Sequence, residues 1–297
     1  MNTPTKVEAP TLGSSAMLVE FSVSLPTATK KDRGATADIT IHNNADSNAA
    51  TVNKKLFAQS KDLAETRKLV GDTRNHLHYA RTLPWGDNGA RLLTTENYFE
   101  YNHQMSNSEH QFWQHVDSFC DNYTYEVAKA QASLGDMFDP NDYPHVEEIR
   151  SKFAWRLNYT PLPSAGDFRV DIGNEAQQQL RDDYDKFYGN QMQKAMNDLW
   201  TRLYDRLTKM SERLTTDGED GHKKTFRDTL VTNLVDVVDL LQTCNITKNT
   251  QMENMRMDLE DTLRGVTPDA LRANESLRIN TKAAIDKAIM ELPSLDI

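Results

Sequence analysis

Residues 74–91 combine cationic and flat aromatic side chains in a pattern that suits the binding of single-stranded nucleic acid. The wider segment Lys30–Arg91 holds 6 Lys and 5 Arg against 7 acidic residues, so it is locally basic. Guanidinium groups attract phosphates, and each base that stacks on an aromatic ring contributes ~1–3 kcal/mol. This stretch therefore predicts a nucleic-acid-binding surface, and its candidate residues are Arg74, His78, Tyr79, Arg81, Trp85 and Arg91.

A second interpretation of the same residues is structural, and it is the one that we favour. Tyr79 and Trp85 would pack the turn around Pro84, and the arginines would pair with acidic helices. The whole chain carries a formal net charge of −10, which argues against a protein that coats nucleic acid. Nucleic-acid binding thus stays an alternative hypothesis.

The sequence lacks the common motifs of phosphate binding and catalysis. The patterns GxxxxGK[ST], GxGxxG, GxSxG and HExxH are all absent. The chain has 44 acidic residues, so neighbouring carboxylates such as Asp182 and Asp183 are expected by chance, and on a helix they point apart. We expect no enzymatic activity, no catalytic residue and no cofactor.

The histidines are not spaced as metal ligands. His103 and His110 share one face of a predicted helix, whereas His115 is rotated away from that face. Zinc requires three or four converging nitrogen or sulfur donors, which only a distant fold-back of the chain could assemble here. We expect no metal site.

Composition bounds the class of protein. Hydrophobic residues make up 38% of the chain, and no apolar run approaches the ~18 residues that a membrane-spanning helix needs. Cys120 and Cys244 form no metal-binding or redox pair, which fits a reducing cytosol. We expect a cytosolic protein without a membrane-spanning segment.

Short segments with period-2 alternation predict a small sheet. Val19, Phe21, Val23 and Leu25 alternate with polar residues, and Pro26 follows them. Phe153–Tyr159 and Asp167–Ile172 show the same pattern on either side of a Pro/Gly turn, which predicts a hairpin. Because a hairpin alone is marginally stable, the N-terminal segment would supply the third strand.

Helical periodicity dominates the rest of the chain. We expect a helix from about Thr51 to Leu77, a turn at 83–89, and one long helix from about Thr95 to Leu134 that ends at Gly135. A short helix would lie near Val146–Arg150. Further helices are expected at 175–214, 226–241, around Leu259 and Leu263, and at 270–292, whereas Lys30–Ala50 would form a loop or at best a weak helix.

These elements predict a predominantly helical α+β protein. Its body would be a long helical hairpin or coiled coil, joined to an antiparallel sheet of about three strands. We expect a flexible arm at residues 1–16, an α+β domain at 17–173 and a helical domain at 174–297. Apolar stripes on long helices favour self-association, and Met192, Met196 and Met210 on one helix suit an adaptable partner surface.

The order of several motifs resembles an uncharacterised family of phage and bacterial proteins that is catalogued as a domain of unknown function. The most specific elements are the Leu-Pro-Trp-Gly-Asp turn at residues 83–87 and the Asp-Phe-Arg-Val strand at residues 167–170. The resemblance covers roughly Leu18 to Leu263. It implies a phage or prophage setting in the cytoplasm of a host bacterium, but no residue-specific role.

We therefore expect a non-enzymatic interaction or assembly protein that uses its long helices. Its partner would be a second copy of the chain or a co-encoded protein, for which the resemblance suggests an AAA+ ATPase. The alternative is an accessory protein that binds single-stranded DNA in phage recombination or replication.

Overall fold

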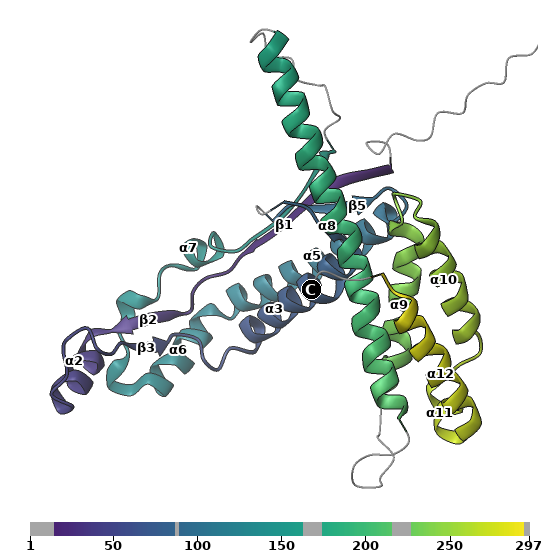
Figure 1. The fold of residues 1–297 in the computed structure, drawn as a ribbon. Helices are drawn as coiled ribbons and strands as arrows, with labels where there is room; N and C mark the ends of the chain where they lie inside the picture. The colour runs from purple at the N-terminus through teal and green to yellow at the C-terminus, as the bar shows by residue number, and fades with distance from the viewer. Residues whose placement is uncertain (1–14, 87–88, 163–173, 216–226, 294–297) are drawn as a thin grey trace, which may run out of the picture. The chain divides into compact units, whose positions relative to one another are not determined.

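The computed structural model describes residues 15–86, 89–162, 174–215 and 227–293 (Figure 1). Two compact units are present, and the chain passes between them several times. Unit 1 contains Met1–Val19, Arg81–Phe99 and Tyr159–Ile297, and unit 2 contains Glu20–Ala80 and Glu100–Asn158.

A four-stranded sheet has the order β4-β5-β1-β6. Its strands are β1 (Ala16–Ser24), β4 (Leu83–Pro84), β5 (Arg91–Thr94) and β6 (Ala154–Pro161). β1 and β5 pair antiparallel, with Ala16 opposite Thr94 and Val19 opposite Arg91. Between β4 and β5, Gly86 and Gly89 have φ values of 72° and 88°, which glycine adopts without strain. The turn expected at 83–89 is therefore confirmed at its described positions.

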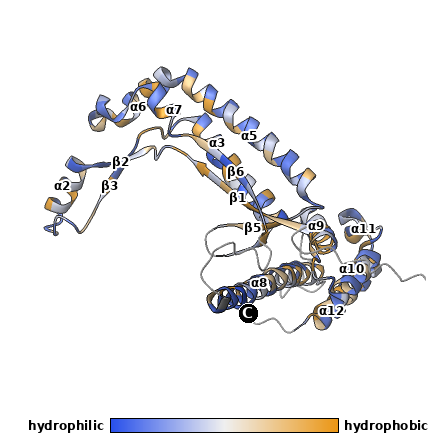
Figure 2. Cartoon of the chain, turned by 90° about the horizontal axis from the view of Figure 1, so that it is seen from above, coloured by the Kyte–Doolittle hydropathy of each residue, from blue (hydrophilic) through white to orange (hydrophobic). Residues whose placement is uncertain are grey.

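The helices of unit 1 are arranged around α8 (Asn174–Leu214). The others are α9 (Thr229–Cys244), α10 (Thr250–Leu263), α11 (Pro268–Ala273) and α12 (Glu275–Glu291). α9 and α12 both pack on the C-terminal part of α8, and α8 carries hydrophobic and hydrophilic residues along its length (Figures 1 and 2). The core that they enclose is aliphatic and methionine-rich, and it also receives Leu83, Trp85 and Leu92 from the strand region.

Unit 2 begins with a two-stranded antiparallel sheet of β2 (Thr29–Asp32) and β3 (Val52–Lys55), connected through α2 (Arg33–His42). Its remaining helices are α3 (Lys61–Asp72), the π-helix η1 (Thr73–His78), α4 (Tyr79–Arg81, shared with unit 1), α5 (Tyr98–Asp121), α6 (Tyr123–Leu134), the 3₁₀ turns η2 (Gly135–Met137) and η3 (Pro140–Asp142), and α7 (Val146–Arg150). Ser60 starts α3, because its hydroxyl accepts a hydrogen bond from the Leu63 amide.

The core of unit 2 is aromatic. Phe57 packs edge-on against Phe119, Phe119 against Phe153, and Phe112 against both Phe153 and Trp155. Edge-to-face packing adds ~0.5–1.5 kcal/mol per pair beyond the area that the rings bury. These contacts join α5 to β6 and to the turn before α3.

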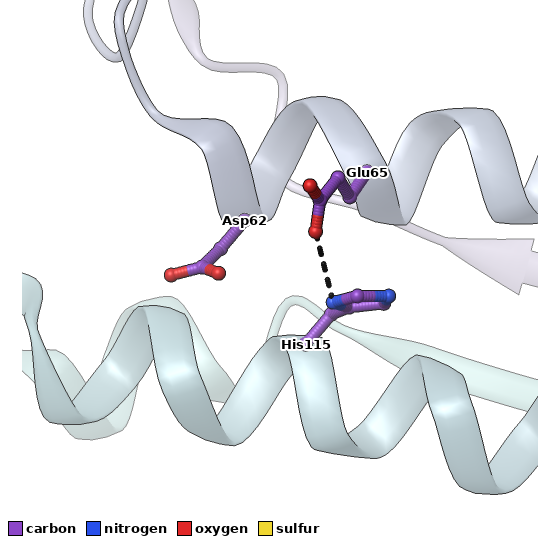
Figure 3. Close-up of side chains that lie close together, drawn as sticks. All are labelled: Asp62, Glu65 and His115. Carbon is purple, nitrogen blue, oxygen red and sulfur yellow. Dashed lines mark ion pairs between the residues drawn. The ribbon is translucent and has the colours of Figure 1, made fainter.

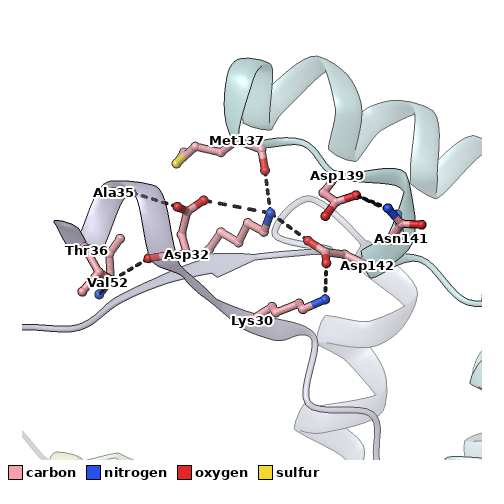
Figure 4. A network of polar contacts seen from close by, with 10 residues as sticks. Lys30, Asp32, Ala35, Thr36, Val52, Met137, Asp139, Asn141 and Asp142 are labelled. Carbon is pink, nitrogen blue, oxygen red and sulfur yellow. Dashed lines mark hydrogen bonds and ion pairs between the residues drawn. The ribbon is translucent and has the colours of Figure 1, made fainter. Parts of the chain in front are cut away.

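A buried ion-pair network holds the β2–β3 sheet to η3 (Figure 4). Lys54 Nζ lies 2.7 Å from Asp142 Oδ2 and donates to the Met137 carbonyl at 2.7 Å. The side chains of Lys54 and Asp142 are only 8% and 1% exposed, and Lys30 donates to the same carboxylate. Burial alone would raise the pKa of Asp142, but hydrogen bonds from Lys30 and Lys54 outweigh it and lower that pKa. The hydrogen bond to Asp142 raises the pKa of Lys54 against the opposing effect of burial.

The predicted fold class is confirmed, because the described chain is mainly helical with small antiparallel sheets. The expected strand near Val19, the strand at Phe153–Tyr159, the short helix at 146–150 and the long helix at 175–214 are also confirmed. The predicted strand at 167–172 lies outside the described residues. Among the described helices, none combines the length and apolar character needed to cross a bilayer.

Several boundaries were wrong. Residues 52–55 form β3 rather than the start of a helix, because they pair with β2. The helix expected to run unbroken to Leu134 is interrupted at Asn122, and the last helix is interrupted at Asn274, whose side chain caps α12 through the Leu277 amide. β4 and β5 were missed. Residues 30–50 were expected to form a loop or at best a weak helix. The structure has the helix α2 within this stretch, and the Asp32 carboxylate caps it.

The predicted division into residues 17–173 and 174–297 does not coincide with the compact units. Residues 81–99 belong with the helices of unit 1, because Leu83, Trp85 and Leu92 lie in the core that α8 helps to form. Residues 1–14 of the predicted arm lie outside the described part of the chain.

We predict that Asp142→Asn destabilises the protein by about 3 kcal/mol, because the buried Lys54 ammonium loses its closer carboxylate and keeps only Asp32, 4.0 Å away. Urea denaturation of this variant, with the exposed Asp136→Asn as the control, measures the loss. Folding lowers the pKa of Asp142. Its contribution to the free energy of unfolding is therefore present above its unfolded pKa near 4 and is lost as the pH falls below that value. The contribution of Lys54, whose pKa is raised, is lost only above about pH 10.5. An equal, small effect of both variants at pH 7 would contradict this role.

Candidate functional surfaces

The six candidate nucleic-acid residues are divided between the two units. Arg74, His78 and Tyr79 belong to unit 2, and Arg81, Trp85 and Arg91 belong to unit 1. Each group is therefore considered by itself.

In unit 1, Trp85 is a core residue. Its side chain is 5% exposed, and its ring lies 5.2 Å from that of Tyr188 in an edge-on arrangement. The amide that follows, that of Gly86, donates a hydrogen bond to the Gln191 side chain at 3.2 Å. The Trp85 indole thus attaches the strand region to α8, and in this position its faces are not open to a stacking base.

Arg91 and Arg202 both bond to Thr82, immediately before β4. Arg91 donates to the Thr82 hydroxyl at 2.6 Å and to its carbonyl at 2.8 Å, and Arg202 of α8 donates to the same carbonyl at 3.0 Å. Arg202 also forms an ion pair with Asp198 at 2.7 Å. These bonds satisfy a backbone carbonyl beside a buried hydroxyl, so Arg91 has a structural role here. Arg81 is half-buried.

In unit 2, His78 and Arg74 lie around Phe21. His78 is buried, its Nδ1 lies 2.7 Å from the Tyr101 hydroxyl, and its ring meets Phe21 edge-on at 5.5 Å. The Arg74 guanidinium lies 6.0 Å from the centre of the Phe21 ring. Tyr79, by contrast, is 44% exposed. Burial thus argues against base stacking at His78 and Trp85. The described contacts of Arg74 and Arg91 are to an aromatic ring and to Thr82 rather than to the acidic helices that the structural interpretation expected, and Tyr79 does not pack the turn as expected.

One set of potential metal ligands was not anticipated from the sequence. Asp62 and Glu65 of α3 and His115 of α5 place ligand atoms within 4.8 Å of one another, because the two helices pack side by side (Figure 3). His115 Nδ1 lies 3.6 Å from Glu65 Oε2, and Ser118 donates to Asp62 at 3.1 Å. Glu65 is mostly exposed, and pairing with His115 already accounts for its position, so we interpret the set as a polar contact between helices.

Two other surfaces of unit 1 have no counterpart in the candidate list. One is the N-terminal part of α8, residues 175–190, in which no side chain is buried. The other is a pocket beside residues 188–200 of the same helix. Comparisons with family models, with curated proteins and with solved structures found no match to this chain. The phage-family resemblance therefore stays a prediction, and function must be argued from these surfaces.

We predict that Trp85→Ala lowers the free energy of unfolding by about 3–5 kcal/mol, because it leaves a large cavity in the core of unit 1. Tyr79→Ala should change it by less than about 1 kcal/mol, because the side chain is substantially exposed. Urea denaturation of the two variants provides the comparison. If Trp85→Ala were as stable as the parent chain but bound an oligonucleotide less tightly, the structural assignment of Trp85 would fail.

Proposed function

We propose that this chain is a non-enzymatic interaction protein that assembles through residues 175–190 of α8. The observation behind the proposal is the contrast between the two parts of that helix. Residues 191–214 include nine buried apolar side chains, among them Leu199, Leu203 and Leu207, which are fully buried. Residues 175–190 include none, although they extend for ~24 Å at the helical rise of ~1.5 Å per residue (Figure 1).

This exposed segment carries an apolar stripe. Leu180, Tyr184 and Phe187 are spaced by four and three residues, so they lie on one face of the helix. Phe187 is 49% exposed, and the other two are partly exposed. An isolated helix of this length is marginal in water, but here the packed C-terminal part of α8 nucleates it. The stripe thus lies on the N-terminal part of a helix whose C-terminal part is anchored in a core.

The charges beside the stripe favour a second copy of this chain as the partner. On one side of the stripe lie Arg181 and Asp185, and on the other side lie Asp183 and Lys186. Each side therefore has one acid and one base, so the segment can satisfy its own charges when it pairs with an identical helix. An interface between identical patches forms a closed twofold dimer. Two helical segments of this length bury less than the ~1,200 Å² of a standard interface, so we expect dissociation constants in the micromolar range.

The proposed setting is the cytoplasm of a bacterial host. Cys120 and Cys244 are both free thiols in the described structure, which is compatible with a reducing compartment. The phage-type setting rests on the family resemblance alone. No catalytic step is assigned to any residue.

The test is the oligomeric state of the full chain over a concentration range. Light scattering after size-exclusion chromatography should detect a rising mass between about 10 and 200 µM. The double variant Leu180→Arg/Phe187→Arg should remain a monomer throughout, because it places like charges on both faces of the contact. Arginine is a good helix former, so the segment itself should stay helical, which circular dichroism can verify.

The matched control is Gln178→Arg, which adds a cation to the opposite face of the same turn region and should leave association unchanged. A parent chain that stays monomeric at 200 µM would contradict self-association. A loss of association in Gln178→Arg as large as that in the double variant would also contradict it. If the chain assembled only after a co-encoded protein or an oligonucleotide was added, that molecule, and not a second copy of the chain, would be the partner.

A further inference from the structure

A pocket of about 550 Å³ lies beside the middle of α8 in unit 1. Met192, Met196 and Trp200 line it from the core side, where each is at least nine-tenths buried. Tyr188 adds a second aromatic ring, and Thr247 and Asn249, between α9 and α10, complete the lining with Gly189, Gln193 and Asn197. Its volume falls within the ~300–1,000 Å³ that is typical of sites for small organic ligands.

The pocket is uncharged. Its described lining contains no Asp, Glu, Lys, Arg or His, and its polar groups are amides and hydroxyls. Burial raises the pKa of Tyr188 to about 12, so its hydroxyl is neutral at any physiological pH. An ionic ligand would lose hydration here and gain no opposite charge, which is costly. Gln193 donates to Asn197 at 2.9 Å, so amide groups for hydrogen bonding lie together at the rim.

Gly189 lies where α8 borders the pocket. It lies within a 41-residue helix, where glycine costs ~0.5–1 kcal/mol relative to alanine. Apart from its two chain neighbours and the adjacent backbone of α8 itself, no described atom lies within 4 Å of the position that its Cβ would occupy. The α8 backbone at Gly189 is therefore open to an occupant of the pocket.

We propose that this pocket binds an uncharged small molecule that contains an aromatic ring. Thioether sulfurs make favourable contacts with aromatic rings, and flexible methionines adapt to the shape of a ligand. The Tyr188 and Trp200 rings supply further aromatic surface, and the rim amides can hydrogen-bond to the edge of the ligand. The pocket shares Tyr188 and Gly189 with the segment proposed for self-association, but the stripe residues Leu180, Tyr184 and Phe187 contribute nothing to its described lining.

The experiment uses indole as the neutral probe and the full chain labelled with ¹³C at its methionine methyl groups. Indole should shift the Met192 and Met196 signals, which Met192→Leu and Met196→Leu assign, and should leave the other methionine signals in place. Indole-3-acetate, which carries a carboxylate, should bind at least fivefold more weakly than indole.

Gly189→Leu should weaken indole binding at least tenfold, because its side chain occupies the pocket. Leucine is a better helix former than glycine, so this variant should fold. The control is Gly71→Leu in α3, another helical glycine with no described atom within 4 Å of a Cβ, and it should bind like the parent chain. The proposal is overturned if millimolar indole leaves the Met192 and Met196 signals unshifted, or if Gly189→Leu binds indole as tightly as the parent.

Discussion

Burial of one face of α8 is the interaction on which unit 1 depends. From Met192 to Leu214 this helix contributes a continuous row of buried side chains, against which α9 and α12 pack. Full burial of a leucine or methionine contributes roughly 1.5–3 kcal/mol, so this row outweighs any single polar contact in the unit. The same helix continues for residues 175–190 without a buried side chain. The packed part of α8 therefore extends into an amphipathic segment in which no described side chain is buried, and the proposed function rests on this difference.

Polar contacts act mainly to fix where segments attach to the two cores. In unit 1, Arg91 and Arg202 converge on Thr82 and orient the chain before β4. In unit 2, Lys54 and Asp142 hold the small β2–β3 sheet to η3. Such buried charges are costly to break but contribute little net stability compared with apolar packing, so they specify geometry rather than drive folding. A basic and aromatic stretch of sequence can thus contribute to structure through contacts of this kind.

The sequence predicted long elements well and short ones poorly, for physical reasons. The 175–214 helix repeats its apolar spacing over many turns, so its limits were predicted to within a residue. β4 and β5 have two and four residues, too few to show alternation, and they exist because β5 pairs with β1, far away in sequence. The methionines at 192 and 196 were identified as an adaptable surface, but periodicity could not separate a pocket from an ordinary core. The contact of His115 with Glu65 also required the packing of α3 on α5.

The central claim is that residues 175–190 become covered when the protein assembles. Hydrogen exchange followed by mass spectrometry, with the full chain at about 2 µM and at about 200 µM, tests it directly. The account predicts that amides in residues 175–190 exchange more slowly at the higher concentration, while those in residues 191–214 exchange at the same rate in both samples. Equal exchange of residues 175–190 at the two concentrations would contradict it.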